Sequence, residues 1–315
     1  MSLPDPSPFD RFVHPARARN QIWRLVVGVI FVFGTLMLAA VPFREIGQAL
    51  NAPQPIAIPD DPELIEEYLR DLNNDPVDTL NNQSSTVTTL LFLLFFGVIP
   101  FALWLLLPIL HKRSFRSLFG PPRLAARQFY ACTLPLLGLF ALSFLLPPWD
   151  FSDLEPNAAF GPWLLMLPFG MAAVLIQTSA EEILFRGYIL QQIAARFRAR
   201  IVWMLVPALL FGALHYTPDL EGSAAWTIPT WAVIFGLATA DLTWRSGSLG
   251  PAIALHFANN CSALLLISVS DELSGLALFT LSMSLSEAGN DPMVLIIDLM
   301  WLLIGWLICR ITLRV

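Results

Sequence analysis

The chain has 315 residues, of which 56% are hydrophobic and only 13% are charged. Soluble globular proteins carry about 25% charged residues, so this composition argues against a soluble protein. Disorder is excluded as well, because disordered chains combine low hydrophobicity with high net charge. The net charge of −6 argues against a nucleic-acid partner, since nucleic-acid binding requires clustered basic surface.

Eight continuous apolar runs predict an all-α, polytopic transmembrane bundle of about eight spans. We expect the spans at 25–43, 88–110, 128–147, 161–185, 201–216, 226–243, 249–269 and 293–309. The first run is longer than the apolar region of a typical signal peptide, so we expect an uncleaved first span. Cys132, Cys261 and Cys309 lie in such runs without a CxxC pair, which favours buried thiols over disulfides or a metal site.

Basic residues gather in alternate gaps between these spans. The gaps and termini of one side hold fifteen of the 18 lysines and arginines, namely Arg11, Arg17, Arg19, Arg24, Lys112, Arg113, Arg116, Arg123, Arg127, Arg196, Arg198, Arg200, Arg245, Arg310 and Arg314. The positive-inside rule makes that side cytoplasmic, with both termini inside and an even number of spans. The arginine-rich composition with one lysine suggests a bacterial inner (plasma) membrane as the location.

This topology suggests three regions. Residues 1–24 form a cytoplasmic tail, residues 25–150 hold the first three spans with an acidic outer loop at 44–87, and residues 151–315 form the functional core with spans four to eight. Within the outer loop, apolar residues at helical spacing over 64–72 predict a short amphipathic helix.

Ionisable residues inside membrane spans are costly and usually functional. Glu181 and Glu182 end the fourth apolar run, and Glu182 lies four residues before Arg186, so those two can pair on one helix face. Glu181 points about 100° away. One interpretation is an interfacial ion pair with a spare carboxylate; the other is one carboxylate fixed by arginine and a second that accepts a proton as a general base. For Glu181 to reach the depth of His215, the fourth helix must continue to about residue 195.

Three further polar residues lie on later helices. His215 ends the fifth span and, taken alone, is typical of an interfacial histidine. His256 and Asn260 are four residues apart in the seventh span and share a helix face, where a hydrogen bond between helices is the simpler explanation.

Two aspartates complete the set. Asp241 closes the sixth span beside Arg245, and Asp298 lies within the eighth span. We expect Asp241 to reach the cytoplasmic interface, and Asp298 to have a structural role or, as the alternative, to relay protons.

Together, a glutamate pair, two histidines and an asparagine supply the groups needed to hydrolyse an acyl bond: a base for water and donors for a developing oxyanion. Glutamate and histidine are also zinc ligands. The HExxH and GxSxG motifs of zincins and serine hydrolases are absent from the sequence.

At these residues the sequence resembles the CPBP group of integral membrane proteases, which includes the type II CAAX prenyl endopeptidases and bacteriocin-processing or self-immunity proteins. Its marks are EExxxR, FxxxH and HxxxN on successive helices. Here they stand as Glu181-Glu182 with Arg186, Phe211 with His215, and His256 with Asn260. The resemblance covers about residues 170–270.

The resemblance implies a bundle of about eight helices with a conical cavity open to the cytoplasmic side and the membrane. It implies that Glu181 activates water with help from His215, that His256 and Asn260 form the oxyanion site, and that Glu182 and Arg186 orient these groups. We favour a mechanism without a metal cofactor; the alternative is Zn²⁺ held by Glu181, His215 and His256. The expected partners are a peptide or protein substrate at the membrane and the lipid bilayer.

Three functions stay open at this point. The chain is expected to be an intramembrane endopeptidase acting on a membrane-associated peptide, prenylated or with a leader. The first rival is a non-proteolytic scaffold or immunity protein of the same fold. The second rival is a proton-coupled transporter that uses Glu181, His215 and Asp298 as relays.

Overall fold

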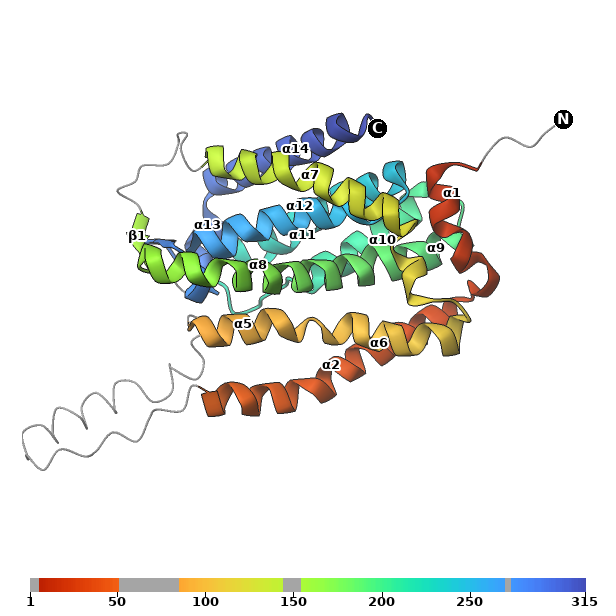
Figure 1. Cartoon of the computed structure of the whole chain (residues 1–315), viewed down its shortest axis with the longest axis horizontal. Helices are drawn as coiled ribbons and strands as arrows, with labels where there is room; N and C mark the ends of the chain where they lie inside the picture. The colour runs from red at the N-terminus through yellow and green to blue at the C-terminus, as the bar shows by residue number, and fades with distance from the viewer. Residues whose placement is uncertain (1–5, 51–84, 144–153, 270–272) are drawn as a thin grey trace, which may run out of the picture.

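The structure, a computed structural model, describes residues 6–50, 85–143, 154–269 and 273–315. Long helices run side by side along one direction and form a bundle, in which α8 (Phe160–Glu182) packs between α5 (Thr86–Phe95) and α12 (Gly250–Cys261) (Figure 1). The predicted all-α membrane bundle is therefore confirmed. The amphipathic helix expected at 64–72 lies outside the described residues.

The other elements follow in chain order. The N-terminal part contains α1 (Pro8–Val13), a 3₁₀ helix (His14–Arg19), α2 (Ile22–Leu50), α5 (Thr86–Phe95), α6 (Val98–Leu106), a π-helix (Leu107–His111), a 3₁₀ helix (Phe115–Leu118) and α7 (Pro122–Ser143). The rest contains β1 (Leu154–Pro156), α8, a π-helix (Ile183–Leu190), α9 (Gln191–Arg196), α10 (Arg200–Ala213), α11 (Ala224–Ser246), α12 (Gly250–Cys261), a π-helix (Ser262–Leu266), β2 (Ile267–Val269), a 3₁₀ turn (Ser274–Leu276), β3 (Phe279–Leu281), α13 (Leu285–Asn290) and α14 (Pro292–Leu313).

Each predicted span contains a helix, although the span expected at 249–269 ends in strand β2 and the span expected at 201–216 extends past the end of α10 at Ala213. Within the described residues, five helical stretches are long and apolar enough to cross a membrane: Ile22–Gly47, Thr86–His111, Pro122–Leu142, Phe160–Arg196 and Pro292–Leu313. The other three predicted spans correspond to α10, α11 and α12; α11 packs against both α10 and α12, and α12 packs against α8. The chain is thus an integral membrane protein, and α12, buried throughout 250–258, lies in its interior.

The two ends of the bundle differ. The N-terminus, α1, α9 and the C-terminus lie at one end, and β1 and α13 lie at the other (Figure 1). The shared end of the two termini agrees with an even number of crossings. Residues 6–19 fold against the bundle here: Phe12 is fully buried, and the ring of Phe9 lies 4.6 Å from that of Trp203.

The helix that carries the two adjacent glutamates continues past them, as the sequence predicts. α8 runs without a break into the π-helix Ile183–Leu190 and then into α9, which ends at Arg196. A π-helix widens the turn, and such insertions are frequent at functional sites. Here it begins directly after Glu182.

A small sheet at the β1 end was not predicted from the sequence. β3 is its central strand, antiparallel to β1 and parallel to β2. Each strand has three residues, which is too short for a period of two to be seen in the sequence. The sheet ties the start of α8 to the segment that follows α12.

Candidate active site

Glu182 is the most enclosed carboxylate of the site. Its side chain is 0% exposed, and its Oε1 accepts hydrogen bonds from Arg186 Nη1 and from His256 Nδ1, each at 2.9 Å. The predicted pairing of Glu182 with Arg186 is confirmed. Removing one partner from such a buried ion pair costs about 3–5 kcal/mol, so Glu182 is held in place by its charge and its hydrogen bonds together.

Glu181 has a different environment on the same turn. Its Oε1 accepts a hydrogen bond from Gln177 Nε2 at 2.8 Å. Its Oε2 is buried and has no hydrogen-bond partner among the described residues. Because no arginine pairs with Glu181 in that part of the chain, one carboxylate oxygen remains available to accept a proton.

His256 links the two carboxylates. An ionised carboxylate only accepts hydrogen bonds, so the contact with Glu182 places a hydrogen on Nδ1. The other nitrogen, Nε2, lies 3.6 Å from Glu181 Oε2. That separation is too long for a hydrogen bond, but a small molecule such as water can sit beside both atoms.

Asn260 enters the same network from α12, one turn beyond His256. Its Nδ2 donates to Gln177 Oε1 at 2.9 Å, and its Oδ1 accepts from Asn259 Nδ2 at 3.2 Å. A chain of hydrogen bonds therefore runs from Asn260 through Gln177 to Glu181.

His215 lies further from these groups. It follows the last residue of α10, and its Nδ1 is 2.8 Å from the carbonyl oxygen of Phe211. Since that oxygen can only accept, Nδ1 carries the hydrogen and Nε2 is free to act as an acceptor in the neutral ring. In the described part of the chain, no hydrogen bond joins His215 to Glu181. The ring of Phe211 is the link, 4.6 Å from the His215 ring and 6.0 Å from the His256 ring.

Aromatic rings enclose the charged groups. The Arg186 guanidinium lies 4.8 Å from the centre of the Phe211 ring, a cation–π contact. Phe235 of α11 approaches His256 with ring centres 4.9 Å apart. Gly236 leaves room for the arginine, because a Cβ there would lie 3.2 Å from Arg186 Nη2.

The zinc alternative needs three ligands around one point. No group of three or more histidine, cysteine, aspartate or glutamate side chains that could hold a metal ion occurs among the described residues. Glu181 and His256 approach each other, but His215 is turned to its own helix. The arrangement as it stands therefore does not fit a three-ligand zinc site.

Neither of two hollows formed by the described residues is lined by the four candidate catalytic residues. The larger, the lateral groove, has a volume of about 430 Å³ and is lined by Arg116, Phe119, Pro122, Ala125, Ala126, Phe129, Tyr130, Leu175, Ser179, Gly250 and Ile253. Ser179 and Ile253, which line the groove, each lie one turn before a member of the buried pair Glu182 and His256. Glu181 is 8% exposed. The conical cavity implied by the resemblance stays a prediction.

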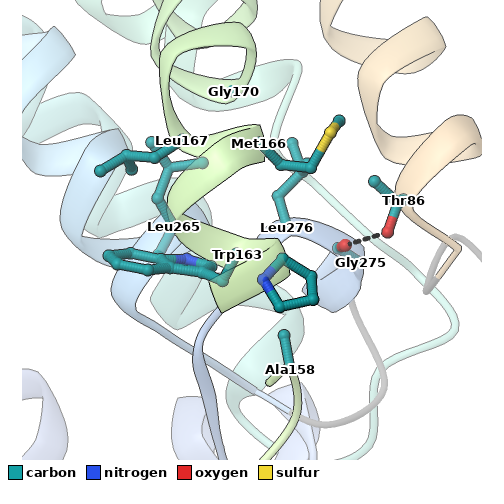
Figure 2. A pocket seen from close by; sticks show the side chains of 10 residues that line it. Thr86, Ala158, Trp163, Met166, Leu167, Gly170, Leu265, Gly275 and Leu276 are labelled. Atoms are coloured by element: carbon teal, nitrogen blue, oxygen red, sulfur yellow. Dashed lines mark hydrogen bonds between the residues drawn. The ribbon is translucent and has the colours of Figure 1, made fainter. Parts of the chain in front are cut away.

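The smaller cavity, of about 90 Å³, lies at the β1 end of the molecule. Figure 2 shows Leu265 beside Trp163 and Leu167 of α8, with Leu276 nearer to Gly275, whose carbonyl oxygen accepts a hydrogen bond from Thr86 at 2.8 Å. It is apolar, and no candidate catalytic residue lines it.

The remaining two predicted groups lie outside the network. Asp241 accepts hydrogen bonds from Arg245, Arg200 and Trp306, which tie α10 and α14 to α11. Asp298 is exposed on the outer face of α14, and no hydrogen bond joins it to another described residue.

Gln177 belongs to the network but to none of the three sequence motifs. It is 6% exposed and lies one helical turn before Glu181 on the same face of α8. The sequence feature that points to Gln177 is its spacing: it is a single glutamine in an apolar run, four residues before the candidate base Glu181.

Comparison with known proteins agrees with the motifs. Residues 162–262 match the protein family described as type II CAAX prenyl endopeptidase Rce1-like. The uncharacterized protein YyaK of Bacillus subtilis (strain 168) is 26% identical over 272 residues, which cover 84% of each chain. No solved structure matches. The matched segment holds the whole of α8 after Gly161 and all three motifs, so the resemblance is confirmed there.

Proposed function

We propose that this chain, whose residues 162–262 are those of an Rce1-like membrane protease domain, is an endopeptidase in which Glu181 activates the water that hydrolyses a peptide bond. The observation that carries the proposal is the Oε2 of Glu181, which is buried, lacks a hydrogen bond among the described residues and faces His256. In the second carboxylate, Glu182, Oε1 is occupied by Arg186 and His256. Its Oε2 also lacks a hydrogen-bond partner among the described residues, but the charge of Glu182 is already paired with Arg186. Glu181 is therefore proposed as the base and Glu182 as the group that supports it.

The proposed reaction uses these groups as follows. A water molecule beside Glu181 Oε2 gives it a proton while the water oxygen bonds to the carbonyl carbon of the substrate. The oxyanion that forms accepts a hydrogen bond from Asn260 Nδ2, and a second from His256 Nε2 when that ring is doubly protonated, because His256 Nδ1 already donates to Glu182. The C–N bond then breaks, and the proton held by Glu181 passes to the leaving amine. His215 is proposed to assist by accepting a hydrogen bond through its free Nε2 once the bound substrate spans the distance, occupied here by the Phe211 ring, between His215 and the other groups.

The substrate is proposed to be the membrane-associated end of a peptide, which reaches the site through the lateral groove. The groove is mostly apolar, and an exposed arginine, Arg116, lies at its rim. An apolar or lipidated segment fits its walls, and a peptide backbone or carboxylate fits the rim. The location proposed is a bacterial plasma membrane with both termini in the cytoplasm, because the basic residues gather at that end.

The test compares protein termini in membrane fractions of cells that carry the wild type or Glu181→Gln at matched expression, by terminal-enrichment mass spectrometry. New termini found only with the wild type support the endopeptidase and identify its substrate class. Identical termini, with the variant still inserted, favour the scaffold or immunity protein instead. Repeating the assay in isolated membranes with a chelator tests the cofactor proposal: cleavage persists if no metal is required.

A further inference from the structure

Gln177 contacts both ends of the proposed catalytic machinery. Its amide nitrogen donates to Glu181 Oε1 at 2.8 Å, and its amide oxygen accepts from Asn260 Nδ2 at 2.9 Å. The first contact lies within α8, and the second joins α8 to α12. One buried side chain therefore touches the proposed base and the proposed oxyanion donor.

The direction of donation along this chain of hydrogen bonds is set by Glu181. An ionised carboxylate only accepts hydrogen bonds, so the nitrogen of Gln177 must face it. The oxygen of Gln177 then faces Asn260, and only the nitrogen of Asn260 can bond to it. With its amide turned over, Asn260 would present an oxygen to an oxygen.

Two consequences bear on the chemistry. One oxygen of Glu181 is occupied by Gln177, so proton transfer is directed to Oε2, the oxygen that faces His256. Asn260 is fixed with its nitrogen toward α8, and its second N–H remains for a substrate oxyanion. Asn259 completes this orientation by donating to Asn260 Oδ1 at 3.2 Å.

We propose that Gln177 is a positioning residue that orients the Glu181 carboxylate and the Asn260 amide together. This inference rests on the proposed function, because it assigns Gln177 a role in that same site. The competing explanation is a purely structural hydrogen bond between two helices, which is common in membrane proteins.

Two substitutions separate the two contacts. Gln177→Leu has a similar shape and removes both hydrogen bonds. Gln177→Glu keeps an oxygen for Asn260 but replaces the donor to Glu181 with a second acceptor. The matched control is Thr178→Val, the next residue, which is fully buried and whose hydroxyl bonds only to the backbone of its own helix among the described residues.

The assay uses the purified full chain in proteoliposomes and an internally quenched, farnesylated peptide with a CAAX-type end as the probe. Gln177→Leu and Gln177→Glu are each expected to lower kcat by about 10- to 100-fold with KM unchanged, the usual effect of removing a group that supports a catalytic one. Thr178→Val keeps the wild-type kcat. A merely structural role would instead lower the amount of folded protein and leave kcat per folded molecule intact.

A double substitution decides whether Gln177 acts through Asn260. If it does, Gln177→Leu lowers kcat by a smaller factor in the Asn260→Ala background than in the wild type, because the orientation that Gln177 gives Asn260 is already lost. A double variant whose kcat falls by the product of the two single factors would overturn the coupling. Wild-type kcat in both Gln177 variants would overturn the proposal while the proposed function stands. Equal, background-level cleavage by wild type and Glu181→Gln would overturn both.

Discussion

His256 Nε2 and Glu181 Oε2 face each other across 3.6 Å without a hydrogen bond between them. The reason is that the same imidazole already donates through Nδ1 to Glu182, which fixes the plane of the ring. Aromatic side chains lie around this pair, with the rings of Phe211 and Phe235 centred 6.0 and 4.9 Å from the His256 ring. The proposed reaction places its water beside both atoms, since 3.6 Å leaves no room between them.

Substitutions of the two adjacent glutamates are expected to differ in their effects, one on cleavage and the other on stability. Glu181→Gln should abolish cleavage but leave the fold intact, because Glu181 pairs with no arginine among the described residues. Glu182→Gln should destabilise the protein by about 3–5 kcal/mol, because it leaves the buried charge of Arg186 without its partner. Thermal unfolding in detergent and cleavage per folded molecule measure the two effects. Equal stability losses in both variants would contradict this division.

Filling the lateral groove should impair substrate entry and leave the chemistry intact. Ala126 lines the groove on α7 and is exposed, so Ala126→Trp narrows the groove without entering the packed core. We expect a higher KM with an unchanged kcat. Leu134→Trp, at an exposed position two turns further along the same helix, is the control. An unchanged KM in Ala126→Trp would show that the substrate takes another route.

The close packing of α10 against α11 depends on a glycine. A Cβ at Gly212 would lie 2.4 Å from Val233 Cγ2 and 2.7 Å from the carbonyl oxygen of Pro229. Gly212→Ala should therefore destabilise the protein by about 1–3 kcal/mol, the usual cost of overpacking. Gly34→Ala is the matched control, since a Cβ there meets nothing within 4 Å. Equal unfolding temperatures for the two variants would contradict the packing argument.

The short helix α13 should lose stability in acid. Its Ser284 and Glu287 form a capping box, and the backbone N–H and hydroxyl of Ser284 hold the pKa of Glu287 below its ordinary value of 4.5. A carboxyl group with a lowered pKa contributes stability above its unfolded pKa and loses that contribution as the pH falls through the folded value. Protection of the 285–290 amides from hydrogen exchange, relative to intrinsic rates, is therefore expected to fall in acid. In Glu287→Gln this pH dependence should be absent; its persistence would assign the effect to another group.

Much of this architecture could be predicted from the sequence. Long apolar runs define helices because a bilayer requires them, and the spacing of Glu182 and Arg186 predicts their pairing. The need to bring Glu181 to the depth of the later motifs predicts the continuation of α8, which the structure confirms. These features depend on local periodicity and on charges that are rare in a membrane.

Other features depend on tertiary contacts that no local pattern shows. Gln177 is recognisable only when α12 places Asn260 beside it. The small sheet joins three short strands from distant parts of the chain. The hydrogen bond between the His215 ring and the carbonyl oxygen of Phe211 depends on how α10 ends, which the sequence does not show. The catalytic roles of all four candidate residues stay predictions.

The central claim is that Glu181 activates water and does not itself attack the substrate. The most direct measurement is a single turnover with excess enzyme in H₂¹⁸O, followed by mass spectrometry of the product and of the enzyme peptide that contains Glu181. Direct attack by water predicts one ¹⁸O atom in the new carboxylate of the product and none in Glu181. An unlabelled product together with ¹⁸O in Glu181 would show a covalent acyl intermediate and contradict the account.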